Sequence, residues 1–123
     1  MLKDKSSSAI VAVSDVGRAR KFYQDDLGLE LVDDSMGEVL VFKTGDTSLV
    51  VYRSEHAGTN KANAVVWGVG DEIEAIVANL REKGVSFEQY PGMDYKDGIH
   101  STGDFKAAWF KDPDGNILHL NNM

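Results

Sequence analysis

The segment FKDPDGNILHL, residues 110–120, predicts two strands joined by a tight turn. Asp112 suits the first turn position because its carboxylate can accept hydrogen bonds from backbone N–H groups ahead of it. Pro113 fixes φ at the next position, and Gly115 tolerates the positive φ that closes such a turn. Apolar residues alternate on both sides, so the segment predicts a β-hairpin. Its unusual member is His119, an ionisable side chain between two leucines.

Composition limits the class of protein. A chain of 123 residues is long enough for one domain with a core and too short for two ordinary ones. The net charge of −7 would repel nucleic acid and anionic membranes, so we expect neither as a partner. The absence of cysteine excludes disulfides, thiolate metal sites and a cysteine nucleophile. The first residues lack the apolar run of a signal peptide, which favours a cytoplasmic location.

A repeat follows from the order of the predicted elements. In the first half we expect a strand at 8–13, a helix from Val16 to Leu27 capped by Asp15, and strands at 29–32, 38–43 and 47–52. In the second half we expect a strand at 64–69, a helix that is capped by Asp71 and ends at Gly84, a strand at 85–89, and the 110–120 hairpin.

The two halves share a register. Asp15 and Asp71 are 56 positions apart, and so are Gly28 and Gly84. Each half is therefore predicted to be one βαβββ module, the first at about 7–54 and the second at about 63–121, within a single domain that covers 1–123.

The register changes later in the chain. Leu49-Val50-Val51 matches Leu118-His119-Leu120 at a distance of 69 positions, so the second half contains 13 additional residues. We place them in a loop at 90–104. Long loops in small domains are more often functional than idle. The side chains that could line a pocket there are Met93, Tyr95, Ile99 and His100. This loop is either a lid over a ligand pocket or an ordinary surface loop, and the sequence leaves both alternatives open.

These features together resemble a known family. They are Val13-Ser14-Asp15 ahead of Phe22-Tyr23, Leu27-Gly28-Leu29, Val69 with Asp71, Gly84-Val85, and the 110–120 hairpin. The chain resembles the vicinal-oxygen-chelate superfamily, also called the glyoxalase/bleomycin-resistance/dioxygenase superfamily. The resemblance implies an α+β fold in which two βαβββ modules form a curled, cup-shaped mixed sheet with helices on its outer face. It also implies a ligand in the cup and a homodimer.

The resemblance also suggests where a metal would be held. Metal-dependent members use four cup positions, which correspond here to Ser8, Val50, Ala64 and His119. His119 is a good ligand and Ser8 a poor one, whereas Val50 and Ala64 have no donor atom. A catalytic metal needs about three or four N or O ligands. We therefore predict no metal and no cofactor, and the chain departs from the glyoxalase I and extradiol dioxygenase patterns.

A rearranged metal site is the alternative. It would combine His100 and His119 with a carboxylate such as Asp94 or Asp97, although nothing in their spacing requires it. Histidines outside a ligand motif, including His56, are more often exposed or hydrogen-bonded to the protein.

Strand alternation predicts which side chains face the ligand. His119 points away from Leu118 and Leu120, which should pack under the helices. Tyr52 and Trp109 are possible stacking surfaces, although ordinary packing explains Trp109 equally well. The predicted ligand-binding residues are His119, Tyr52, Val50, Ser8, Ala64, Trp109 and His100. Alternatively, His119 has no role in function. It is then a histidine at a sheet edge or dimer surface whose ring is hydrogen-bonded to the backbone.

Three functions remain open at this point. The first is a metal-free protein that binds or sequesters an antibiotic or metabolite, similar to the bleomycin-resistance group. The second is a glyoxalase-like or dioxygenase-like enzyme, a lyase or isomerase, that uses a divalent metal at a non-standard site. The third is a metal-free enzyme with His119 as general base. The sequence contains no nucleotide-binding loop and no Ser-His-Asp arrangement to compete with these.

Overall fold

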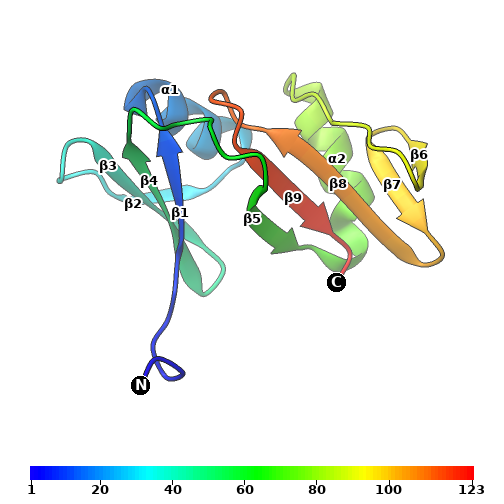
Figure 1. Cartoon of the computed structure of the whole chain (residues 1–123), viewed down its shortest axis with the longest axis horizontal. Coiled ribbons are helices and arrows are strands. Elements are labelled where there is room, and N and C mark those ends of the chain that lie inside the picture. Colours follow the sequence, from blue (N-terminus) through cyan, green and yellow to red (C-terminus); the bar gives the residue numbers. More distant parts are fainter. The chain divides into compact units, whose positions relative to one another are not determined.

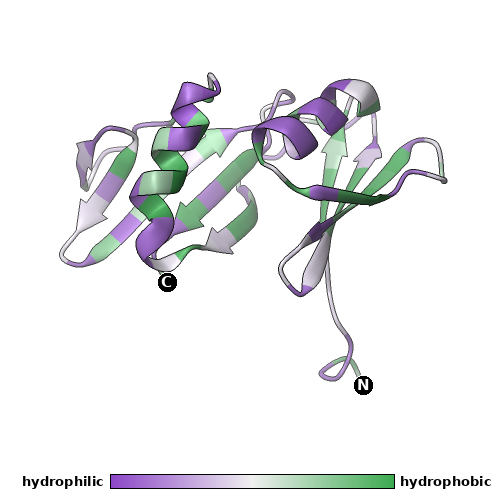
Figure 2. Cartoon of the chain, turned by 180° about the vertical axis from the view of Figure 1, so that it is seen from behind, coloured by the Kyte–Doolittle hydropathy of each residue, from purple (hydrophilic) through white to green (hydrophobic).

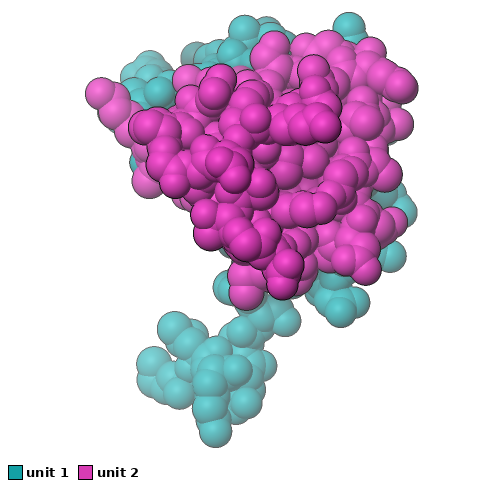
Figure 3. Space-filling model, turned by 90° about the vertical axis from the view of Figure 1, so that its right-hand side faces the viewer, with its two compact units in different colours: residues 1–60, 113–116 teal, residues 61–112, 117–123 magenta.

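The structure is a computed structural model that describes all 123 residues. It divides into two compact units, shown in different colours in Figure 3. Unit 1 consists of Met1–Asn60 and Pro113–Asn116, and unit 2 of Lys61–Asp112 and Ile117–Met123. Each unit contains one β-sheet and one principal helical segment. No helix has both the length and the apolar character needed to cross a membrane.

Unit 1 is built on a four-stranded sheet with the order β1-β4-β3-β2 (Figure 1). Its elements are β1 (Ala9–Val13), α1 (Val16–Arg20), a π-helical turn (Lys21–Asp26), β2 (Glu30–Asp33), β3 (Val39–Thr44) and β4 (Thr47–Arg53). β1 and β4 run parallel, and the other neighbouring strands are antiparallel. Alternate residues of the strands, such as Leu49 and Val51, are buried under the helix.

The first helix begins as the sequence predicts. The Asp15 carboxylate accepts a hydrogen bond from the Arg18 backbone N–H at 2.9 Å, which caps α1. Farther along, the Leu27 N–H donates to the Phe22 carbonyl, five residues back, and this widens the last turn into a π-helix. Phe22 and Tyr23 are both buried there, with their ring centroids 5.1 Å apart.

The turn Pro113–Asn116, which joins β8 (Phe105–Lys111) to β9 (Ile117–Asn121), belongs to unit 1. The Asp114 carboxylate accepts hydrogen bonds from the Ser14 N–H at 3.1 Å and the Ser14 hydroxyl at 2.6 Å. The Arg18 guanidinium donates to the same carboxylate at 3.0 Å. Asn116 donates from its side-chain amide to the Ala12 carbonyl at 2.7 Å. The 110–120 segment thus forms the expected hairpin, and its turn is fixed by residues about a hundred positions earlier in the chain.

Unit 2 is built on a five-stranded sheet with the order β5-β9-β8-β7-β6. Its elements are β5 (Asn63–Gly68), a 3₁₀ turn (Gly70–Glu72), α2 (Ile73–Glu82), β6 (Asp94–Lys96), β7 (Ile99–Thr102), β8 (Phe105–Lys111) and β9 (Ile117–Asn121). α2 lies across one face of this sheet, and polar and apolar bands alternate along it (Figure 2). Leu118, Leu120 and Phe110 are buried on that face.

The repeat is confirmed, because both sheets place a parallel first strand beside their last strand. The prediction of a strand at 85–89 is wrong. This segment makes only one bridge, between Phe87 and Phe110. β7 pairs with the neighbouring part of β8, where His100 lies opposite Ala107 and Thr102 lies opposite Phe105. The counterpart of β2 is therefore β7, whose first residue Ile99 lies 69 positions after Glu30, and the additional residues lie between Gly84 and β7.

The loop prediction for 90–104 is also wrong, because this segment contains β6, β7 and the turn between them. Asp97 and Gly98 form the turn with φ values of 53° and 90°. A Cβ on Gly98 would lie 3.1 Å from Val77 of α2, so the turn packs closely beneath the helix. Asp71 does not cap α2 with its side chain, since the 3₁₀ turn precedes the helix.

Candidate functional site

Trp109 and His119 form the centre of the candidate site, on the face of the unit 2 sheet that α2 does not cover. The two residues lie directly opposite each other on β8 and β9. Their rings stack, with centroids 4.6 Å apart and planes inclined by 19°. Trp109 is half-buried, whereas His119 is buried. The structure thus settles the orientation of Trp109, which the sequence leaves open.

His119 is held in one tautomer. Its Nδ1 lies 3.2 Å from the Ala108 carbonyl oxygen, which can only accept, so Nδ1 carries the proton. Nε2 is then an acceptor, and the nearest donor is the Asn121 amide nitrogen at 3.4 Å. Burial lowers the pKa of His119 below its ordinary value, and the hydrogen bond to Ala108 offsets part of this effect. His119 is therefore a neutral, oriented imidazole at pH 7.

His100 adds a second histidine from β7. Its side chain is fully buried opposite the small residue Ala107. The Tyr90 backbone N–H donates to His100 Nε2 at 2.8 Å, so Nδ1 carries the proton and has no partner. The His100 ring contacts Trp109 edge-on, with centroids 5.1 Å apart. A buried donor without a partner is costly, which makes His100 an unusual member of this face.

Two tyrosines extend the row of rings. Tyr95 on β6 meets His100 edge-on at 4.8 Å, and Tyr90 stacks on His100 at 5.9 Å and contacts Trp109 at 5.4 Å. We call Tyr90, Tyr95, His100, Trp109 and His119 the ring cluster. Tyr90 is not among the predicted ligand-binding residues, because it stands outside any strand. Its position ten residues before His100 carries no periodic signal.

The remaining predicted residue in unit 2 is Ala64 on β5. It lies where the pairing of β5 with β9 is irregular, two residues before Val66, which is directly opposite His119. Ala64 is half-buried, and Val66 is 57% exposed. β5 therefore contributes a small apolar edge beside the ring cluster and no polar group.

Three predicted residues belong to unit 1. Val50 and Tyr52 are half-buried on β4, on the sheet face opposite the core residues Leu49 and Val51. Val50 lies opposite Ile10 of β1, and Tyr52 lies opposite Ala12. Ser8 precedes β1 and is exposed. The structure thus brings His100, Trp109 and His119 together in one unit and groups Val50 with Tyr52 in the other.

Comparison with known proteins assigns the family. Residues 6–120 match the model of the glyoxalase/bleomycin resistance protein/dioxygenase superfamily. The chain belongs to this superfamily. A similar curated protein is the virulence protein STM3117 of Salmonella typhimurium, which is 23% identical over 98% of this chain and 85% of that protein.

Several solved structures share this fold. A glyoxalase/bleomycin resistance protein from Streptomyces sp. CB03234 is 28% identical, with a TM-score of 0.66 over 94% of this chain and 99% of that one. Lactoylglutathione lyase from Agrobacterium tumefaciens is 17% identical, with a TM-score of 0.75 over 98% and 95%. The fosfomycin resistance protein FosX from Listeria monocytogenes is 14% identical, with a TM-score of 0.76 over 99% and 92%.

The residues at the superfamily's metal positions do not fit a divalent cation. Val50 and Ala64 carry no donor atom, and Ser8 offers only a neutral hydroxyl. No group of three or more histidine, aspartate and glutamate side chains lies close enough together to hold a metal ion. His119 alone has the chemistry of a ligand, and its Nδ1 is oriented by a carbonyl as metal-binding histidines usually are.

Proposed function

We propose that this chain binds a small, partly apolar molecule against the ring cluster, in the manner of a metal-free member of the glyoxalase/bleomycin resistance group. The observation that carries the proposal is the pairing of a half-buried indole with a neutral imidazole whose Nε2 can accept. An indole face supplies apolar contact, and one oriented acceptor fixes a donor group of the ligand.

The neighbouring residues support this function. Val66 and Tyr90 are both exposed beside the buried rings, at 57% and 37%. Exposed apolar side chains around a few oriented polar groups are typical of small-molecule sites. Fosfomycin resistance proteins are among the chains of similar fold, which favours an antibiotic or a related metabolite as the first class to test.

The proposal can be tested by tryptophan fluorescence. Trp67→Phe leaves Trp109 as the single tryptophan reporter. A thermal-shift screen of antibiotics, including fosfomycin and bleomycin, and of aromatic metabolites selects ligands, which are then titrated against Trp109 emission. We expect saturable quenching that weakens at least about tenfold in His119→Ala and is unchanged in the exposed control His56→Ala. Ligands that raise the melting temperature without changing Trp109 emission would contradict this site.

A catalytic role for His119 is the second candidate. The hydrogen bond from Nδ1 to the Ala108 carbonyl places the lone pair on Nε2, as a general base requires, and the substrate would replace the long 3.4 Å contact of Nε2 with the Asn121 amide. Product analysis after incubation with each bound ligand separates a binder from an enzyme. We expect His119→Gln to abolish turnover while Trp109 quenching persists if His119 is the base.

The metal-dependent alternative has its own test. The protein is purified without a metal-affinity tag, its metal content is measured, and Ni²⁺, Zn²⁺, Mn²⁺ and Fe²⁺ are titrated into wild type and His119→Ala. We expect no stoichiometric binding. One tightly bound equivalent in wild type that is lost in the variant would replace the metal-free proposal with an enzyme of the glyoxalase or dioxygenase type.

We further propose a cytoplasmic homodimer. Ile10 on the edge strand β1 is 63% exposed and Val66 on the edge strand β5 is 57% exposed, so each sheet presents apolar surface at one edge. Light scattering coupled to size-exclusion chromatography should give about twice the mass of one chain. Asp substitution of Ile10 or Val66 should shift the protein toward the monomer.

A further inference from the structure

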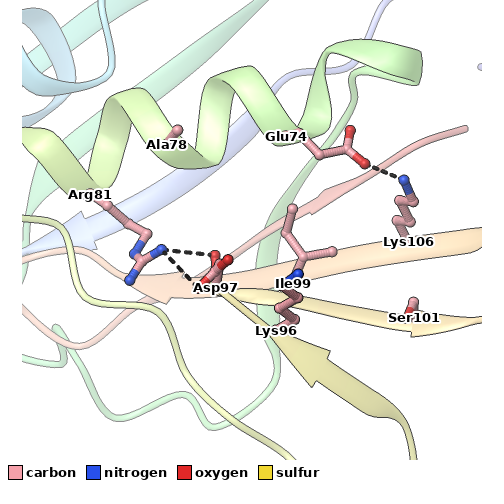
Figure 4. Close-up of a pocket in the computed structure, with 8 residues that line it drawn as sticks. All are labelled: Glu74, Ala78, Arg81, Lys96, Asp97, Ile99, Ser101 and Lys106. Carbon is pink, nitrogen blue, oxygen red and sulfur yellow. Dashed lines mark hydrogen bonds and ion pairs between the residues drawn. The ribbon is translucent and has the colours of Figure 1, made fainter.

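A groove of unit 2 lies on the opposite side of its sheet from the ring cluster. The groove has a volume of about 470 Å³ and lies between α2 and the β6–β7–β8 strands. One stripe of α2 forms its wall, with Glu74, Ala78 and Arg81 at helical spacing (Figure 4). Ile99 and Ser101 of β7 form its floor. The volume falls in the range of small-molecule sites.

An ion pair closes each end of this groove. The Glu74 carboxylate accepts a hydrogen bond from the Lys106 ammonium at one end. At the other end, Arg81 donates to the Asp97 backbone carbonyl at 3.2 Å and lies 3.9 Å from the Asp97 carboxylate. Glu74 and Arg81 are separated by two helical turns, about 10 Å along the axis. The lining between the two ends includes the small Ala78, the apolar Ile99 and Ser101.

The charges of the lining are unequal. Three cations, Arg81, Lys96 and Lys106, face two carboxylates, although the whole chain has a net charge of −7. Lys96 is in no ion pair, and it lines the groove beside Asp97. The excess positive charge therefore lies at the Arg81 end.

Arg81 is also oriented to bind an anion. The Asp97 backbone carbonyl fixes one of its nitrogens, and the Asp97 carboxylate approaches only to 3.9 Å. The remaining guanidinium donors can bind a carboxylate in the usual two-pronged geometry. Opening the Asp97 contact costs little because both side chains are at least half exposed.

We propose that this groove is a second ligand site, which binds a small organic carboxylate whose short apolar chain covers Ala78 and Ile99. The carboxylate group lies between Arg81 and Lys96, where it replaces the distant carboxylate of Asp97. This site is independent of the ring cluster, because α2 and the ring cluster lie on opposite faces of the sheet.

Hexanoate is the probe, and two-dimensional ¹H–¹⁵N NMR is the readout. We expect saturable shifts of the amides of α2 and the β6–β7 turn, without shifts at Trp109 and His119. Hexanol, hexylammonium and acetate serve as controls for the charge and for the apolar chain. We expect each of them to bind at least about fivefold more weakly than hexanoate.

Variants separate the groove from general electrostatic attraction. Arg81→Gln and Lys96→Gln should each weaken hexanoate binding at least about fivefold, whereas Asp97→Asn should strengthen it. Lys111→Gln is the matched control, because Lys111 is paired with Glu88 outside the groove. The proposal would be overturned if hexanol bound as tightly as hexanoate, or if Lys111→Gln weakened hexanoate binding as much as Arg81→Gln does. Chemical shift changes centred on Trp109 would also overturn it. Shifts at Trp109 would do so while supporting the ring cluster as a site.

Discussion

Trp109 and His119 lie opposite each other on adjacent strands, and their rings stack at a centroid distance of 4.6 Å. Stacking of this kind contributes about 0.5–1.5 kcal/mol beyond the area that it buries. We predict a coupling energy of about this size between Trp109→Leu and His119→Gln in a double-mutant cycle, measured by urea unfolding. Trp109→Leu combined with Arg81→Gln, on the α2 side of the sheet, should be additive. Additivity of the first pair would show that the stack contributes nothing.

The lowered pKa of His119 predicts a loss of stability in acid. Burial disfavours the charged imidazole in the folded state, so the unfolded chain takes up this proton at higher pH than the folded chain does. The stability should therefore fall as the pH drops below about 6.5, the ordinary histidine value. The fall should stop once the pH is below the folded pKa. Urea unfolding between pH 7.5 and 5 measures this.

Two variants test whether His119 causes this pH dependence of stability. His119→Gln should flatten the part of the pH dependence below neutrality, whereas His56→Gln should leave it unchanged, because His56 is exposed. In Trp67→Phe, the Trp109 emission should decrease as His119 becomes charged, since an imidazolium quenches a stacked indole. A quenching midpoint above 6.5 would contradict the direction of the pKa shift.

Substitution of Asp114 should reduce stability more than is usual for a residue in a turn. Its side chain is 8% exposed and accepts from two groups of Ser14 and from Arg18. Asp114→Ala should lower the free energy of unfolding by about 1–3 kcal/mol, because it leaves these donors without their acceptor. Arg18→Gln should cost less, at most about 1 kcal/mol, since Arg18 is half exposed. The exposed Asp104→Ala is the control, and a cost for Asp114→Ala no greater than that of Asp104→Ala would refute the assignment.

Gly58 and Gly37 form a matched pair of glycines. Both have positive φ, +74° and +76° respectively. A Cβ at Gly58 would lie 2.1 Å from the Asp114 carbonyl oxygen, whereas a Cβ at Gly37 would meet nothing within 4 Å. Gly37→Ala should therefore cost only the backbone strain, about 1–2 kcal/mol. Gly58→Ala should cost about 1–3 kcal/mol more, because the backbone must move. Equal unfolding midpoints in urea would count against the close contact.

The sequence predicts most of unit 1 because its signals are local. The Asp15 cap, the helical spacing that ends at Gly28 and the strand alternation from β2 to β4 each lie within a few residues. The structure reproduces them, except that the second part of the helix, Lys21–Asp26, is π-helical. The face of β9 follows from the same alternation, since Leu118 and Leu120 are buried on the α2 side, opposite the side on which His119 meets Trp109.

The insertion could not be placed from the sequence, because its position depends on which segment pairs with each part of the β8 edge. Val85–Gln89 has the composition of a strand, but it makes only one bridge to β8, at Phe110, whereas β7 pairs with residues 105–107 of β8. An Asp97-Gly98 pair between short polar strands is a weak signal when seen alone. The role of Tyr90 could not be foreseen for a related reason. It follows from a backbone hydrogen bond to His100, which no sequence periodicity encodes.

The turn Pro113–Asn116 has a consequence for the order of synthesis. Ser14 and Asp114 are separated by 100 positions, and Ala12 and Asn116 by 104. A ribosome that has released the first sixty residues has therefore supplied β1 to β4 without the side chains that satisfy Ser14 and the Ala12 carbonyl. Unit 1 acquires its complete set of hydrogen bonds only after residues 114–116 have been synthesised. Contacts this distant in sequence slow folding, so the first half of the nascent chain stays incompletely hydrogen-bonded until the turn Pro113–Asn116 has emerged.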